Sequence, residues 1–188
     1  MDTFGQRLKN SFMRNLKYVL IGIITLALSY LAVNLFAPNR IEFKESILID
    51  AKADVVYGFC SDLQTWGRWN QSFIGAVGVE NEFSDPSNGP EAIWTLVSAG
   101  EKIGRVRTVE YEENLRLKTS IDLGLDTNWL VIEWVFEESE TGTKVTCIAE
   151  GQETAFGWRF INLGLETKLN GMYVGALEGL KQISQAQS

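Results

Sequence analysis

The sequence contains no histidine, and its two cysteines, Cys60 and Cys147, stand apart in apolar surroundings. Histidine is the usual zinc ligand and the commonest general base near neutral pH, so its absence excludes imidazole-based catalytic triads. Two cysteines without a CxxC motif do not make a disulfide framework. We predict that both cysteines are small buried thiols. The alternatives are a disulfide bridge between them or a nucleophilic thiol. We also predict no metal and no cofactor.

Positive charge is scarce beyond the N-terminal region. Residues 1–40 carry five basic side chains and one acid, so the remainder carries −11 of a total net charge of −7. A domain this acidic repels phosphate groups, and nucleic acid is therefore not an expected partner. The segment AKADVV after the first predicted strand lacks the glycines of a phosphate-binding loop. The glutamates gather at predicted strand ends, and no spacing selects two of them for acid–base chemistry.

Residues 18–36 form a run of 19 side chains without a charge. At ~1.5 Å per residue this run makes a helix of about 28 Å, close to the hydrocarbon thickness of a bilayer. A cleaved signal peptide is the alternative, although its apolar core is usually shorter, about 7–15 residues. We therefore predict a basic N-terminal segment at 1–17, a single-pass transmembrane anchor at 18–36 and a ligand-binding domain at 41–184.

Basic residues flank the predicted span unequally. Four precede it and three follow it more thinly: Arg7, Lys9, Arg14 and Lys17, then Arg40, Lys44 and Lys52. Because the more positive flank stays in the cytoplasm, the N-terminus is expected there and the domain on the periplasmic or extracytoplasmic side. Pro38 suits the end of the helix, and the short linker 37–40 holds the domain close to the bilayer.

The hydrophobic period changes several times after residue 41. Residues 41–49 mostly alternate as in a half-buried strand, residues 51–62 switch to helical spacing, and a short helical turn carries two tryptophans. Alternation then returns, and turn-rich segments separate six expected strands, at about 73–83, 91–100, 102–112, 115–123, 127–138 and 143–152. A long helix over 155–184 closes the chain, with an apolar stripe that includes Trp158, Ile161, Leu169, Ala176 and Leu180.

The order of these elements resembles the START-like or SRPBCC superfamily and, within it, the polyketide cyclase/dehydrase and lipid-transport family. The matching positions are Ile47 to Asp50, Val56 to Phe59, Asp62, Trp66 and Trp69. The stretch WLVIEWVFEESETGTKVTCIAEG also looks like that family's last hairpin. The resemblance spans about residues 41–183 and implies an α+β helix-grip fold, a curved antiparallel sheet around a long C-terminal helix with an apolar cavity between them. Members range from lipid carriers to aromatic cyclases, so the fold does not give the function.

Candidate ligand contacts come from the faces expected to point inward. In the strand around Trp134, alternate residues form a uniformly apolar face, whereas Arg116, Lys118, Ser120 and Asp122 are expected on a solvated face. The predicted ligand-binding set is Trp69, Trp94, Leu117, Thr119, Trp134, Phe136, Leu165, Leu169 and Met172. A filled hydrophobic core explains the same residues without a ligand.

Arg105 and Arg107 share one strand face, where they either grip a carboxylate or phosphate or pair with acidic residues on neighbouring strands. We predict a membrane-anchored protein that binds a hydrophobic or amphipathic, lipid-like small molecule, and we identify no catalytic residues. Two alternatives remain, a polyketide cyclase/dehydratase-type enzyme that works by positioning and an interaction module with a collapsed cavity. Two or more convergent ionisable groups on the inner face of the sheet would favour the enzyme.

Overall fold

The computed structural model describes residues 3–70, 78–122 and 130–187, so the predicted strand starts at 73 and 127 lie outside the described residues. The chain divides into two compact units. One, the helical unit, comprises residues 1–39 with 154–163. The other, the sheet unit, comprises residues 40–153 with 164–188.

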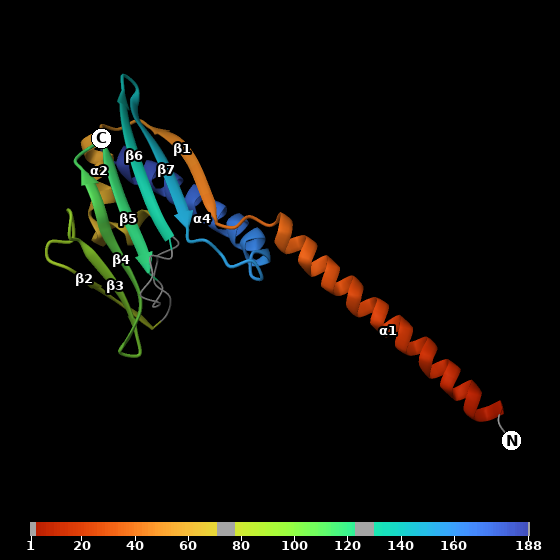
Figure 1. Cartoon of the computed structure of the whole chain (residues 1–188). Helices are drawn as coiled ribbons and strands as arrows, with labels where there is room; N and C mark the ends of the chain where they lie inside the picture. The colour runs from red at the N-terminus through yellow and green to blue at the C-terminus, as the bar shows by residue number, and fades with distance from the viewer. Residues whose placement is uncertain (1–2, 71–77, 123–129, 188) are drawn as a thin grey trace. The chain divides into compact units, whose positions relative to one another are not determined.

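The helical unit is built on α1 (Thr3–Phe36), the long helix near the N-terminus of the chain in Figure 1. Its portion Asn15–Phe36 is long and apolar enough to cross a membrane, a property shared by signal sequences near an N-terminus. The large apolar side chains of this portion are exposed, so they find little cover within the protein.

The sheet unit contains one seven-stranded antiparallel sheet, with strand order β1-β7-β6-β5-β4-β3-β2 (Figure 1). The strands are β1 (Glu42–Ile49), β2 (Val79–Phe83), β3 (Ile93–Ser98), β4 (Glu101–Glu112), β5 (Arg116–Asp122), β6 (Leu130–Ser139) and β7 (Gly142–Gly151). Strands β2 to β7 form a meander, and β1 pairs with β7. Register shifts between β3 and β4 and between β4 and β5 mark bulges, which bend the strands that contain them. The predicted antiparallel meander is confirmed.

Alternation along β6 determines which face of the sheet is buried. Leu130, Ile132, Trp134 and Phe136 are at most 2% exposed, and the side chains between them are half-buried. Successive side chains in a strand point to opposite faces, so these four lie on one side of the sheet. This inner face is the one predicted from the sequence.

The opposite face of β5 differs from the prediction. Ser120 and Asp122, expected to be solvated, are buried. The cause is the neighbouring strand β4, whose long arginine side chains lie across them. Arg107 Nε donates to Ser120 Oγ at 3.1 Å, and Arg105 forms an ion pair with Asp122 at 3.3 Å. The arginines therefore pair across the sheet, as one of the two sequence interpretations expects.

Short helices connect β1 to β2. They are α2 (Ala53–Ser61), the 3-10 turn η1 (Leu63–Thr65) and α3 (Trp66–Trp69). Asp54 lies in the first turn of α2, where a carboxylate stabilises the positive end of the helix dipole. The Asp62 carboxylate accepts a hydrogen bond from a backbone N–H of η1 and so caps that turn. Trp66 and Trp69 are the first and last residues of α3, and both are buried.

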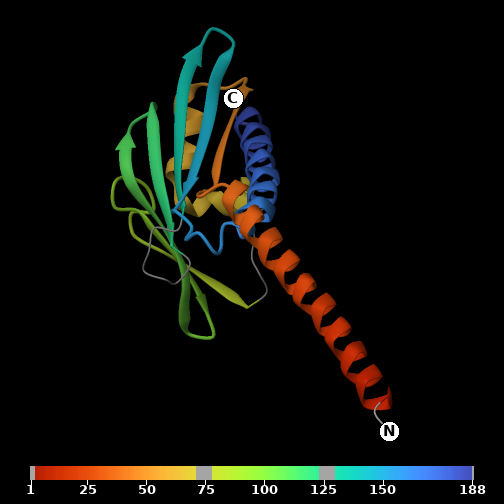
Figure 2. The same ribbon diagram turned by 45° about the vertical axis from the view of Figure 1, so that its right-hand side comes forward.

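The last helix, α4, spans Phe160–Gln185 rather than beginning at Ala155, because turns occupy the residues before it. From residue 164 onward it covers the inner face of the sheet, with buried side chains at Leu169, Tyr173, Ala176, Leu177 and Leu180 (Figure 2). Trp158 and Ile161 were expected on the same buried stripe, but they are 62% and 45% exposed. The predicted α+β helix-grip fold is confirmed, and the first part of the apolar stripe is exposed instead of buried.

Gly179 allows α4 to approach α3 closely. A Cβ atom at this position would overlap the carbonyl oxygen of Trp69 and would lie 3.0 Å from its carbonyl carbon. Backbone atoms cannot rotate away as a long side chain can, so the contact requires a glycine. The packing of α4 therefore depends on this residue having no side chain.

Candidate ligand-binding site

The predicted ligand-contacting residues come together in the interior of the sheet unit. Six of these residues are buried in one hydrophobic core cluster: Trp69, Trp94, Leu117, Trp134, Phe136 and Leu169. Leu165 and Met172 are partly buried and pack against that cluster, whereas Thr119 is fully buried on β5 beside Ile132. The structure thus gathers the predicted set in one place, and its contact with a ligand remains a prediction.

Three indole rings form the centre of this interior. The Trp134 ring centroid lies 6.3 Å from that of Trp66 and 5.7 Å from that of Trp69, edge to face in both pairs. Aromatic pairs of this geometry contribute about 0.5–1.5 kcal/mol each beyond the burial of their area. Trp66 is absent from the predicted set, although its spacing of three residues from Trp69 on a helical turn is a signal that could have included it.

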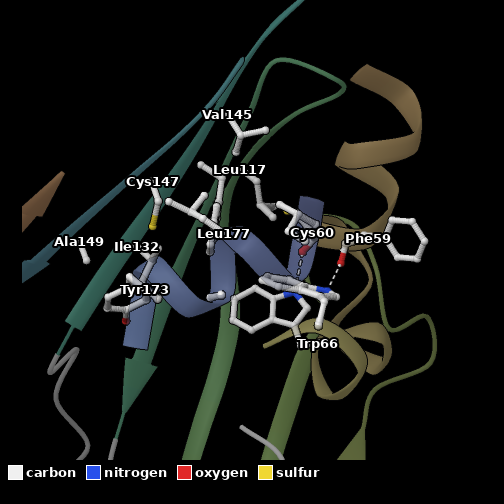
Figure 3. Close-up of a cluster of buried hydrophobic side chains, with 14 of the residues drawn as sticks. Phe59, Cys60, Trp66, Leu117, Ile132, Val145, Cys147, Ala149, Tyr173 and Leu177 are labelled. Atoms are coloured by element: carbon white, nitrogen blue, oxygen red, sulfur yellow. Dashed lines mark hydrogen bonds between the residues drawn. The ribbon is translucent and has the colours of Figure 1, made fainter. Parts of the chain in front are cut away.

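The indole N–H groups of these tryptophans have different surroundings. Trp66 Nε1 donates to the Cys60 carbonyl at 2.8 Å (Figure 3). Trp69 Nε1 donates to the Phe59 carbonyl at 3.2 Å, and both carbonyls lie at the end of α2. Helix C-termini leave such carbonyls free for partners of this kind. Trp134 Nε1, in contrast, has no hydrogen-bond partner although its side chain is fully buried. A buried donor without an acceptor costs about 1–3 kcal/mol, so a ligand oxygen would satisfy it.

Two threonine hydroxyls lie on the same inner face. Thr108 on β4 stands directly opposite Thr119 on β5, and both side chains are buried. Thr108 Oγ1 has no hydrogen-bond partner, and Thr119 Oγ1 donates to the Ile132 carbonyl over a long 3.5 Å. The inner face therefore presents weakly satisfied polar atoms within an otherwise apolar surface.

The titratable groups of the interior are neutral. Cys60 and Cys147 are free and buried, as predicted, and burial raises the pKa of both thiols (Figure 3). Burial also raises the pKa of Tyr57, helped by Tyr111, and of Tyr173. None of these groups ionises near pH 7, because an ion in this apolar space loses its hydration.

Charge is confined to the other side of the sheet. Within residues 3–70, 78–122 and 130–187, Asp122 is the one buried charged side chain, and it pairs with Arg105 on the outer face. The described inner face thus lacks the pair of convergent ionisable groups that would favour an enzyme. It can bind and orient an uncharged group.

A hollow of about 280 Å³ lies at the surface beside α2. Its lining includes Asp54, Tyr57, Asn88, Tyr111 and Glu113, so it is largely polar. The Tyr57 ring is buried, touches this hollow and packs edge-on against Phe136, with centroids 5.3 Å apart. Tyr57 therefore separates the hollow from the apolar interior. Sequence reasoning missed the hollow because its residues come from three separate segments.

A family model described as polyketide cyclase/dehydrase and lipid transport matches residues 40–185. The matched range includes the whole sheet, α2, α3 and all of α4. No curated protein matches the chain.

Solved structures share this fold at low sequence identity. A protein of unknown function from Staphylococcus aureus is 14% identical, with a TM-score of 0.61 over 81% of this chain and 98% of that one. A Polyketide_cyc-like protein from Corynebacterium glutamicum is 22% identical, with a TM-score of 0.51 over 80% and 93%. The di-domain ARO/CYC StfQ from the steffimycin biosynthetic pathway is 11% identical, with a TM-score of 0.57 over 79% and 51%. These likenesses show the fold.

Proposed function

Because the chain belongs to the polyketide cyclase/dehydrase and lipid transport family, which has a ligand-binding fold, we propose that it binds a hydrophobic or amphipathic, lipid-like molecule between the sheet and α4. The observation that carries this proposal is the inner face itself. It is apolar and uncharged, yet Trp134 Nε1 offers a buried donor without an acceptor. The ligand class that suits this face has an apolar body and at least one neutral hydrogen-bond acceptor.

The accessible edge of the interior is on α4. Leu165 and Met172 pack against the core while remaining partly exposed, so a ligand meets them before it reaches the indoles. An apolar molecule that buries about 300 Å² gains roughly 7 kcal/mol at about 25 cal/mol per Å², before the costs of immobilisation and ordering. Because Trp134 is fully buried, hydrogen bonding to its indole requires a neighbouring side chain to rotate.

Anchoring by α1 is the second part of the proposal. The span Asn15–Phe36 suits a bilayer in length, and the denser basic flank at Arg7 to Lys17 supports a cytoplasmic N-terminus. The domain then lies on the extracytoplasmic side.

Alkaline extraction of membranes tests retention of the anchor. An impermeant thiol reagent applied to intact cells carrying Thr141→Cys tests the side, because Thr141 is exposed and the native thiols are buried.

Native mass spectrometry of the full chain, released from its own membrane in detergent, tests ligand binding. The expected result is a lipid-sized adduct at unit stoichiometry. Met172→Lys places a charge at the accessible edge and should abolish the adduct. Val174→Lys is the matched control, since Val174 is 47% exposed two residues later on the same helix, and it should leave the adduct intact. Equal loss in both variants would refute the proposed binding site.

An interaction module with a collapsed interior is the second candidate. The close packing of Trp66, Trp69 and Trp134, each at most 2% exposed, favours it. The two functions differ in their response to ligands. If the wild-type chain carries no adduct and its tryptophan emission is unchanged across a panel of lipids and polyketides, the ligand-binding proposal fails and the interaction module replaces it.

A further inference from the structure

The segment that follows β7 and ends in the first turn of α4 exposes several large apolar side chains. In residues 154–163, here called the aromatic segment, Phe156 is 43% exposed, Trp158 62%, Phe160 39% and Ile161 45%. Isolated exposed apolar side chains are normal on proteins, but adjacent aromatic ones mark a surface that contacts something else. The rings of Trp158 and Phe160 stack with centroids 6.3 Å apart, so they form one continuous apolar surface.

The aromatic segment is attached to the C-terminal end of α1, within the helical unit. The Tyr30 hydroxyl donates to the Gly157 carbonyl, and the Tyr30 ring lies 6.1 Å from that of Phe160. Asn34, one turn further along α1, is fully buried in this unit. The last turns of α1 and the aromatic segment therefore form one packed structure.

Hydrogen bonds fix the polar side of the segment. Asn162 Nδ2 donates to the Pro38 carbonyl at 2.9 Å, and the backbone N–H of Thr154 donates to the Asn39 carbonyl at 2.6 Å. Thr154 Oγ1 joins these two attachments through a 3.1 Å hydrogen bond to Asn162 Oδ1. These hydrogen bonds attach the segment to the residues that follow α1, and its aromatic side chains remain exposed.

The position along α1 identifies what covers these side chains. Tyr30 lies six residues before Phe36, the last residue of the apolar span, which is about 9 Å along the helix axis. Amphipathic elements at a bilayer surface insert about 5–10 Å into the boundary between headgroups and acyl chains. Tryptophan and tyrosine concentrate at this boundary because their rings are apolar and their N–H or O–H groups are polar. Arg159, stacked over Phe156 at 5.5 Å, adds a cation that suits lipid phosphates.

We propose that the aromatic segment inserts into the interface of the bilayer in which α1 is anchored, with Phe156, Trp158, Phe160 and Ile161 as the inserted side chains. This inference rests on the proposed retention of α1 as a membrane anchor. Lipid molecules cover the exposed side chains of the aromatic segment. The chain therefore enters the membrane interface a second time after β7, through the residues before α4 and the first turn of α4.

Depth-dependent fluorescence quenching tests the insertion. The full chain is labelled with an environment-sensitive thiol dye at Ile161→Cys, reconstituted into phosphatidylethanolamine and phosphatidylglycerol vesicles, and exposed to lipids with nitroxides along their acyl chains. Cys60 and Cys147 are buried, so they do not take up the dye in the folded protein. Leu26→Cys, 72% exposed within the span, reports anchoring, and Thr141→Cys, in the exposed turn between β6 and β7, is the control for the sheet unit.

The expected result is strong quenching and a blue-shifted emission at positions 26 and 161, with neither change at position 141. Quenching at 26 without quenching at 161 would overturn the inserted segment while leaving the anchor in place. Absence of quenching at both positions would overturn the anchor itself, and with it this inference. Equal quenching at 161 and 141 would show general contact of the protein with lipid and would also overturn the proposal. Phe156→Cys repeats the measurement at a second site of the segment.

Discussion

Replacing Gly179 by alanine should destabilise the sheet unit, although alanine is the better helix former. In a helix interior alanine is favoured over glycine by about 1 kcal/mol. Against this gain, the new Cβ overlaps the carbonyl of Trp69. Overpacking of this kind costs typically about 1–3 kcal/mol, and a backbone carbonyl can yield only if α3 or α4 moves.

Gly175→Ala isolates the steric cost. Gly175 lies one turn earlier on α4, and a Cβ there meets no atom within 4 Å. The gain in helix propensity is common to both variants, so their difference in unfolding free energy equals the overpacking term, about 1–3 kcal/mol. Gly175→Ala should be as stable as the wild type or up to about 1 kcal/mol more stable.

The measurement is guanidinium unfolding of the full chain in detergent micelles, followed by the emission of the buried indoles. Thermal unfolding should show the same order, at roughly 3 °C per kcal/mol for a domain of this size. If Gly179→Ala and Gly175→Ala unfold at the same denaturant concentration, the close approach of α4 to α3 is wrong.

Three other outcomes follow from the interior. Thr143→Val removes the 2.8 Å hydrogen bond from Thr143 Oγ1 to the buried Ala51 carbonyl. It should lower the free energy of unfolding by about 1–3 kcal/mol, measured with denaturant, and an unchanged free energy would contradict the burial of this hydrogen bond. Burial raises the pKa of Cys60 and Cys147 above the ordinary value of 9.0, so above pH 9 the unfolded chain releases protons that the folded chain keeps. Unfolding free energy should therefore be insensitive to these thiols below pH 8 and fall as the pH rises beyond 9, with thiol-reagent uptake only on unfolding. Trp134→Phe removes the unpartnered donor and should lower ligand affinity about tenfold or more, measured by titration, while Trp emission of the remaining indoles reports an intact fold.

Alternation in the sequence was sufficient to predict the sheet and the inner face of β6. It failed for Ser120 and Asp122, because a period-two pattern assigns a residue to a face but does not say what crosses that face. Arginine side chains from β4 are long enough to bury both positions. The sequence pattern alone does not show how far these arginine side chains extend across the sheet.

The candidate residues on the strands lie together in the interior because strand pairing brings residues on one face together, while their contact with a ligand stays a prediction. The unpartnered N–H of Trp134 could not be predicted, since it depends on where its neighbours' carbonyls lie. The apolar stripe of the last helix also misled at Trp158 and Ile161. Helical periodicity identifies an apolar face, but it does not distinguish a face that meets a sheet from one that we propose meets lipid.

The pairing of β1 with β7 sets the order in which the sheet is completed. Ser46 and Thr146 share a 2.9 Å hydrogen bond across one hundred residues, and β1 is the first strand made whereas β7 is the last. During synthesis β1 leaves the ribosome with its hydrogen-bonding edge open until the chain has been extended through residue 151. Such a distant pairing slows folding, because the intervening chain must be ordered first. A ribosome stalled before β7 therefore carries an unclosed sheet, in which β1 still lacks its partner strand.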